Sequence, residues 1–163
     1  MALDHMCAAA DARHRGVRAS LAAVSELLPT IAGDGPPAPE LLARFEDLAV
    51  FLERHCTREE QLLWPAFAAL AEAARRQQPR PPLPFPTMLH PVRLMESEHT
   101  QLRARLDHLR DLTVELALPV DAVDRWRKVR DGLATLTAAV ADHERYEDEV
   151  LYPEALEVER RLG

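Results

Sequence analysis

The chain has 163 residues, of which 47% are hydrophobic and 29% charged, and only 5 are glycine, so it can bury one sizeable core and disorder is excluded. We expect one domain spanning residues 1–163. A formal charge of −7 excludes a nucleic-acid partner, no apolar run approaches the roughly 20 residues that cross a bilayer, and two cysteines without a signal peptide indicate a reduced, cytoplasmic protein.

Proline and glycine divide the chain into four segments of roughly 30 residues, each rich in Leu, Ala, Arg and Glu. The first break is the Gly- and Pro-rich stretch 33–39. The second contains six prolines between positions 79 and 91, and the third is the short stretch 118–121. Because no segment alternates with period two, the sequence predicts an all-α fold, an antiparallel up-down-up-down four-helix bundle.

Apolar residues recur every three or four positions in all four segments, which is the spacing of the buried face of a bundle helix. In the second segment we expect this face to continue past Glu59 to Leu62 and Ala66. In the fourth segment we expect it to continue past Glu147 to Val150. Each helix should therefore present one unbroken face to the core.

Each apolar face carries one histidine, and the second and fourth faces also carry a glutamate one turn further on. Residues four apart are neighbours on a helix, about 6 Å apart along the axis. Counting about 1.5 Å per residue from the turns places the four histidines at similar heights. The residues predicted to meet in one layer of the core are His14, His55, Glu59, His99, His143 and Glu147.

The sequence contains an internal repeat. Residues 55–65 match residues 143–153 in their His-x3-Glu spacing and in the Pro that ends each stretch, and residues 11–21 match residues 96–106 around their histidines. The two copies are offset by 88 and 85 residues. Two copies of one helical hairpin would build a pseudo-symmetric site, which suits a pair of metal ions better than a single ion.

Two interpretations of these polar residues compete. Four histidines and two glutamates can satisfy one another as a buried polar network, and a single histidine on an apolar face is often a satisfied core residue. Burying an unpaired carboxylate, however, costs several kcal/mol, and a cation would satisfy it. Imidazole and carboxylate ligands suit iron or manganese, whereas a structural zinc site more often has Cys ligands.

With these motifs the chain resembles the hemerythrin-like, or HHE cation-binding, domain over essentially its whole length. The residues that carry the resemblance are His55-Cys-Thr-Arg-Glu-Glu-Gln-Leu-Leu-Trp-Pro65, Met95-Glu-Ser-Glu-His99 and His143-Glu-Arg-Tyr-Glu147 running on to Pro153. The resemblance implies a non-haem centre of two iron ions, joined by an oxo bridge and by carboxylates, with manganese or zinc as substitutes. It implies iron ligation by His14, His55, His99 and His143, and bridging by Glu59 and Glu147.

Two branches of this family differ at positions that can be checked here. Oxygen-carrying hemerythrins have a His four residues before the third-helix His, where this chain has Met95, and an Asp five residues after the fourth-helix His; in this chain Glu147 follows His143 by four residues. The chain resembles instead the repair-of-iron-centres branch, which protects or restores iron–sulfur clusters. Members of that branch carry a small Cys-containing domain before the bundle, which we expect this chain to lack.

The resemblance implies a protein, monomeric or dimeric, that binds or reacts with a small oxidant (O2, NO or peroxide) in oxidative or nitrosative stress defence or in cluster repair. A protein partner for iron delivery would fit that role. One alternative is a non-catalytic oxygen or iron sensor, or an iron-binding module; another is a mononuclear or zinc-bound structural bundle. Whether the chain is an enzyme stays open.

Residues beside the predicted ligands have several interpretations. Cys56 is rotated by about 100° from the ligand face and is interpreted as a small buried hydrophobe, with redox work as the alternative. Glu98 either accepts a hydrogen bond from a ligand, lines an access path or lies on a solvated face. Trp64 and Tyr152 are expected to pack in the core, and the prolines that follow them are expected to kink or end their helices.

Overall fold

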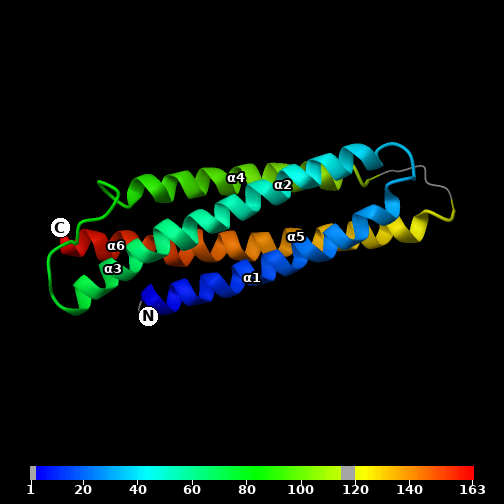
Figure 1. Ribbon diagram of the computed structural model, residues 1–163. Coiled ribbons are helices and arrows are strands. Elements are labelled where there is room, and N and C mark those ends of the chain that lie inside the picture. Colours follow the sequence, from blue (N-terminus) through cyan, green and yellow to red (C-terminus); the bar gives the residue numbers. More distant parts are fainter. Residues whose placement is uncertain (1–2, 115–119) are drawn as a thin grey trace.

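The computed structural model describes residues 3–114 and 120–163, which form four helical rods (Figure 1) and contain no β-strand. The prediction of an all-α four-helix bundle is confirmed. In chain order the elements are α1 (Leu3–Leu27) with the 3-10 turn η1 (Leu28–Ile31), α2 (Ala38–Arg58), the π-helical turn η2 (Glu59–Leu63), α3 (Trp64–Arg75), α4 (Leu89–Asp111), α5 (Val123–Tyr146), the π-helical turn η3 (Glu147–Leu151) and α6 (Tyr152–Leu162).

The four rods lie side by side along the length of the molecule. α1 packs along α5, α2 packs along α4, and α3 packs against α6. The N-terminus, α3, α6 and the C-terminus lie at one end of the bundle, and the turn between η1 and α2 lies at the other (Figure 1). Within the described part of the chain, no helix is long and apolar enough to cross a membrane.

The three predicted breaks have different outcomes. The first is a turn in which Gly35 has a φ of 80°, a conformation that glycine adopts without strain. The second, between α3 and α4, is attached to α6 by Glu159, whose carboxylate accepts hydrogen bonds from Arg80 Nε at 2.8 Å and from the Met88 backbone N–H at 3.0 Å. The third predicted break, 118–121, lies partly outside the described residues.

Pro65 and Pro153 do not end their rods, so that part of the expectation is wrong. Each rod continues through its proline, because a π-helical turn precedes it. The backbone N–H of Trp64 bonds to the carbonyl of Glu59, five residues back, and Tyr152 bonds to Glu147 in the same way. A proline has no N–H to donate, and the wider turn accommodates the missing bond.

These π-helical turns also correct the predicted buried face. Leu62 has an exposed fraction of 44%, whereas Leu63 is fully buried. In the fourth rod Val150 is half-buried and Leu151 is fully buried. A π-helical turn contains one more residue than an α-helical turn, so the face that points to the core moves forward by one position after each glutamate.

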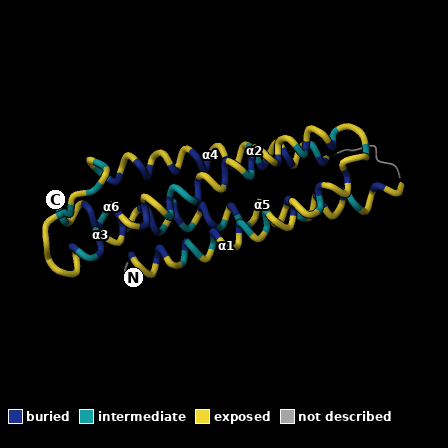
Figure 2. The backbone as a smooth tube through the Cα atoms, viewed as in Figure 1, coloured by how far each residue is buried: buried dark blue, intermediate teal, exposed yellow. Residues whose placement is uncertain are grey.

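The buried residues of every rod, drawn dark blue in Figure 2, face the bundle interior. The apolar residues there form two clusters rather than one continuous core. One cluster includes Val17, Leu52, Leu102 and Val140, and the other includes Phe67 and the residues packed around it near the chain termini. The predicted ligand layer lies between the two clusters.

Candidate metal centre

All six predicted ligands have an exposed fraction of 0%, and they come from all four rods. The histidines form two close pairs. The rings of His14 and His143 are 4.8 Å apart, and those of His55 and His99 are 4.9 Å apart. The structure therefore brings the predicted residues together in one layer, as their heights along the helices indicate.

The two glutamates lie between the histidine pairs. Glu59 Oε2 is 3.2 Å from His14 Nε2 and 3.3 Å from His55 Nε2. Glu147 Oε1 is 3.3 Å from His14 Nε2 and 3.1 Å from His143 Nδ1, and its Oε2 is 3.3 Å from His99 Nε2. Each carboxylate therefore faces both pairs, which is the placement that a bridging ligand requires.

These short approaches are not hydrogen bonds. Among the described residues, five buried atoms of the layer have no hydrogen-bond partner: His14 Nε2, Glu59 Oε2, His99 Nε2, His143 Nδ1 and Glu147 Oε1. Buried polar atoms are otherwise almost always paired, so an unpaired set converging on one region calls for a ligand. Nitrogen and carboxylate oxygen donors suit iron, manganese and zinc, and the residues present therefore fit a metal centre.

The ligand atoms of the layer form two overlapping groups, and within each group all of the atoms lie within 4.8 Å of one another. One contains His14, Glu59, His143 and Glu147, and the other contains His55, His99, His143 and Glu147. The layer is therefore large enough to offer two neighbouring positions, and His143 and Glu147 belong to both groups.

Three of the histidines are oriented by carboxylates outside the layer. The Nδ1 atom of His14 bonds to Glu60 at 2.7 Å, that of His55 bonds to Glu98 at 3.0 Å, and that of His99 bonds to Asp148 at 2.9 Å. Such contacts fix the ring and direct its Nε2 atom toward a metal.

Of the three interpretations of Glu98, the structure selects the acceptor of a ligand's hydrogen bond. Sequence reasoning missed Glu60 and Asp148. A signal was present, because an acidic residue follows each predicted bridging glutamate in both copies of the repeat.

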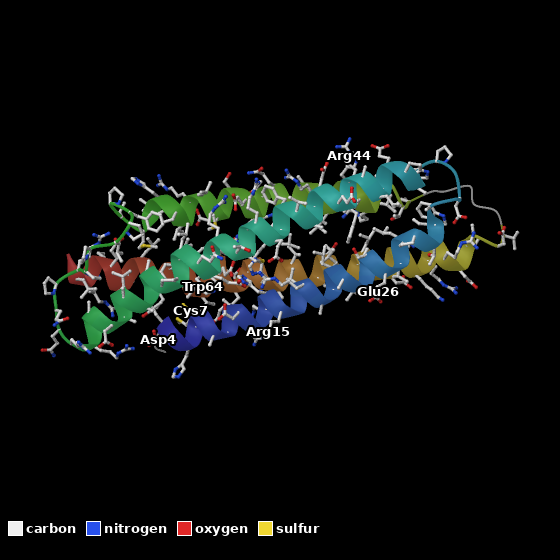
Figure 3. All side chains as sticks on the ribbon, in the orientation of Figure 1. Asp4, Cys7, Arg15, Glu26, Arg44 and Trp64 are labelled. Carbon is white, nitrogen blue, oxygen red and sulfur yellow. The ribbon has the colours of Figure 1, made fainter. Side chains whose placement is uncertain are left out.

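Tyr152 is a third residue whose role sequence reasoning missed, because it was assigned to packing alone. Its buried hydroxyl donates a hydrogen bond to Glu59 and lies 3.4 Å from Glu147 Oε2, while its ring stacks on His99. The π-helical turn brings a residue five positions after Glu147 onto the ligand face. In the other copy Trp64, labelled in Figure 3, stacks on His14 and donates to Asp11 at 2.8 Å.

Cys56 lies closer to the layer than its rotation on the helix indicated. It is fully buried, and its sulfur lies within 4.8 Å of ligand atoms of His14 and His143. The reason is that these histidines come from neighbouring rods and not from its own. Burial, and then the nearby charge of Glu59, raises the pKa of the Cys56 thiol, so the thiol is neutral at ordinary pH.

The charges of the layer depend on one another. Burial alone would lower the pKa of His14, but the carboxylates of Glu147 and Glu59 raise it to about 10. Burial likewise opposes protonation of His99, and Asp148 and Glu147 raise its pKa to about 10. Burial would raise the pKa of Glu147, yet the surrounding histidines hold it well below its usual range. Protons therefore balance the buried carboxylates when no cation does.

This fold and this layer of histidines and glutamates define a cation-binding helical bundle. The chain matches the family described as "Hemerythrin HHE cation binding domain" over residues 5–81 and 90–162, and it belongs to that family. The predicted family resemblance is confirmed.

Curated relatives include a "Probable iron-sulfur cluster repair protein" of Haemophilus influenzae, 25% identical over 155 residues, which cover 94% of this chain and 64% of the relative. The "Iron-sulfur cluster repair protein YtfE" of Yersinia pseudotuberculosis is 28% identical over 147 residues, 88% of this chain and 60% of the relative. The protein of the same name in Escherichia coli O157:H7 is 27% identical over 155 residues, 94% of this chain and 64% of the relative. The chain thus spans less than two thirds of the length of these relatives.

Proposed function

We propose that the chain is a non-haem di-iron protein that binds or reacts with a small oxidant, such as O2, NO or peroxide, in oxidative or nitrosative stress defence or in iron–sulfur cluster repair. The observation that carries this proposal is the set of five unpaired, fully buried ligand atoms in the layer between the two histidine pairs. The names of the curated relatives support the extension to cluster repair. In that role a protein partner would receive iron.

In this proposal His14, His55, His99 and His143 would hold the two ions. Glu59 and Glu147 would bridge them, because each carboxylate approaches at least two of these histidines. Four imidazoles and two bridging carboxylates supply eight bonds, fewer than two six-coordinate ions require. When bound, iron supplies an open coordination position and redox chemistry toward a small ligand.

The protein's own residues prepare the site for that chemistry. The apolar clusters on either side of the layer exclude bulk water, which favours small uncharged ligands over large polar ones. Glu60, Glu98 and Asp148 fix the orientation of three imidazoles. The Tyr152 hydroxyl holds a proton beside the carboxylates of Glu59 and Glu147.

Anaerobic iron loading tests the proposal. We expect two iron equivalents per chain and an absorption spectrum that changes on exposure to air. The double variant Glu59→Gln, Glu147→Gln should keep the helical circular-dichroism spectrum and lose the metal pair, and two equivalents bound to this variant would show that the bridging assignment is wrong. Binding of one zinc ion, in protein from iron-supplied cells, would favour a structural bundle.

Consumption of peroxide or NO by the reduced, iron-loaded protein separates a reactive centre from a sensor or an iron-binding module. Turnover above that of the double variant supports the reactive centre. Binding without turnover supports the sensor.

A further inference from the structure

Two aromatic side chains lie beside predicted ligands, at equivalent positions of the internal repeat. The indole of Trp64 stacks on the ring of His14, with ring centres 5.8 Å apart and planes inclined by 26°. The ring of Tyr152 stacks on that of His99, with centres 6.1 Å apart and planes inclined by 9°. In both halves the stacked residue is the first of the helix that follows the π-helical turn. Each half therefore places one easily oxidised ring beside the layer.

The surroundings of the two rings differ. Tyr152 has an exposed fraction of 1%, and its hydroxyl donates to the buried Glu59. Trp64 has an exposed fraction of 7% and reaches the wall of a surface pocket of about 340 Å³. The other side chains that line this pocket are those of Asp11, Arg15, Arg18 and Glu60. The indole of Trp64 thus lies between His14 and a pocket at the surface, whereas the ring of Tyr152 is enclosed.

The indole of Trp64 is also placed beside a negative charge. Its N–H donates to Asp11 Oδ1 at 2.8 Å. Indole is among the side chains that lose an electron most easily, and the oxidised ring carries a positive charge. A hydrogen-bonded carboxylate stabilises that charge, more strongly where most of the surrounding water is excluded. Asp11 should therefore ease the loss of an electron from Trp64.

We propose that Trp64 is a redox-active residue that gives one electron to an oxidant at the metal layer and is restored by a small reductant from the pocket. When hydrogen peroxide is the oxidant, it takes up two electrons and two protons and becomes two water molecules. If only one of the two iron ions is ferrous, one electron comes from that ion and the second from the Trp64 indole, which becomes a cation radical beside Asp11. The inference rests on the proposed function, because it requires bound iron.

Electron paramagnetic resonance tests the proposal. Iron-loaded protein is half-oxidised with one equivalent of ferricyanide per two irons, mixed with hydrogen peroxide and frozen. We expect a radical signal that narrows when the protein contains ring-deuterated tryptophan. Trp64→Phe should abolish the signal, and Trp126→Phe should leave it unchanged. A signal that is insensitive to deuteration, or that persists in Trp64→Phe, would assign the electron to another residue and overturn the inference.

Trp126 is the matched control within the chain. It is also buried, with an exposed fraction of 3%, and its indole N–H also donates to a carboxylate, that of Asp34 at 3.1 Å. Asp34 belongs to the turn between η1 and α2, so Trp126 lies at the end of the bundle opposite to α3 (Figure 1). The two tryptophans therefore share burial and a polar contact, and they differ in their distance from the ligand layer.

A pair of charge variants tests the role of Asp11. Asp11→Asn keeps an oxygen that can accept the indole N–H but removes the negative charge, so it should lower the yield of the radical. Glu26→Gln removes a charge from an exposed position on the same helix and should not change the yield. The variants are compared at equal iron content, after circular dichroism has established that each is helical. Equal yields in the two variants would overturn the role of Asp11.

Peptide mass spectrometry of the wild-type protein gives a second readout, which covers the case in which Trp64→Phe fails to fold. After repeated additions of peroxide to the loaded protein without a reductant, we expect oxygen atoms to be added at Trp64 and not at Trp126. Ascorbate should protect Trp64. Equal oxidation of both tryptophans, or the same oxidation of Trp64 in metal-free protein, would overturn the inference.

The outcomes separate this inference from the proposed function. Two bound irons and consumption of peroxide, with neither a tryptophan radical nor oxidation of Trp64, would overturn the inference and leave the di-iron function standing. Failure of the protein to bind iron would overturn both.

Discussion

The hydroxyl of Tyr152 donates a hydrogen bond to the carboxylate of Glu59, joining the start of α6 to the π-helical turn of a different rod. A bond to a buried charged group contributes more than a neutral one, so Tyr152→Phe should lower the free energy of unfolding of the metal-free protein by about 1–3 kcal/mol. Urea unfolding measures this loss.

The matched control for that prediction is Tyr146→Phe. The Tyr146 hydroxyl is buried but has no hydrogen-bond partner in the described structure, so its removal should leave the free energy of unfolding unchanged or slightly higher. Equal losses in the two variants would show that the Tyr152 contact contributes nothing specific. In the iron-loaded protein, Tyr152→Phe should also shift the absorption spectrum, because the carboxylate it orients would be free to turn.

The π-helical turn after Glu59 predicts a sharp difference between adjacent leucines. Leu63 is fully buried, whereas Leu62 is 44% exposed. Leu63→Ala should lower the free energy of unfolding by about 2–5 kcal/mol, and Leu62→Ala by less than about 1 kcal/mol. Thermal or urea unfolding of the two variants checks the order. The reverse order would mean that the rod continues as an uninterrupted α-helix.

Stability of the metal-free protein should depend on pH in a defined window. The pKa values of His14 and His99 are raised from 6.5 to about 10 in the folded chain, so their contribution is fully present below pH 6.5 and is lost as the pH rises toward 10. The pKa of Glu147 is lowered from 4.5, so its contribution is present above pH 4.5 and is lost as the pH falls.

Unfolding of the metal-free chain should therefore show maximal stability between about pH 4.5 and 6.5, contributed by this layer. The double variant Glu59→Gln, Glu147→Gln should reduce the decline toward pH 10, because it removes both carboxylates that raise the pKa of His14. These carboxylates also raise the pKa of His99, but Asp148 remains beside that ring. An unchanged alkaline decline in that variant would assign it to other groups.

Metal uptake near pH 7.5 should release protons. Neutral imidazole is the form that binds a metal, and His14 and His99 carry protons in the metal-free chain at this pH. Loading in weakly buffered solution with a pH indicator should therefore acidify the solution, and the apparent affinity should rise with pH from 6.5 toward 10. Loading without proton release would mean that these histidines are neutral before the metal arrives.

The fold could be predicted from sequence because its determinants are local and repeated. Apolar residues at three- and four-residue spacing define each rod, and the turns contain Gly and Pro. The meeting of the six polar residues followed from helix geometry, because the rise per residue converts sequence distance from a turn into height. Their role as metal ligands stays a prediction.

The remaining features depend on contacts between rods. The π-helical turns could not be predicted from spacing, because His-x3-Glu fits an α-helix. The buried face moves forward by one residue only after the glutamate. The partners Glu60 and Asp148 lie beside a ligand in sequence but bond to histidines on other rods. The repeat did not reveal the role of Tyr152, because its counterpart Trp64 makes a different contact. The Tyr152 hydroxyl donates to Glu59, whereas the Trp64 ring nitrogen donates to Asp11.

The division of the interior into two apolar clusters explains how such a centre is tolerated. Burying four imidazoles and two carboxylates is costly, and here that cost is confined to a single cross-section of the bundle. Each apolar cluster packs without residues of this layer, so we expect the chain to keep its helical fold when no metal is bound.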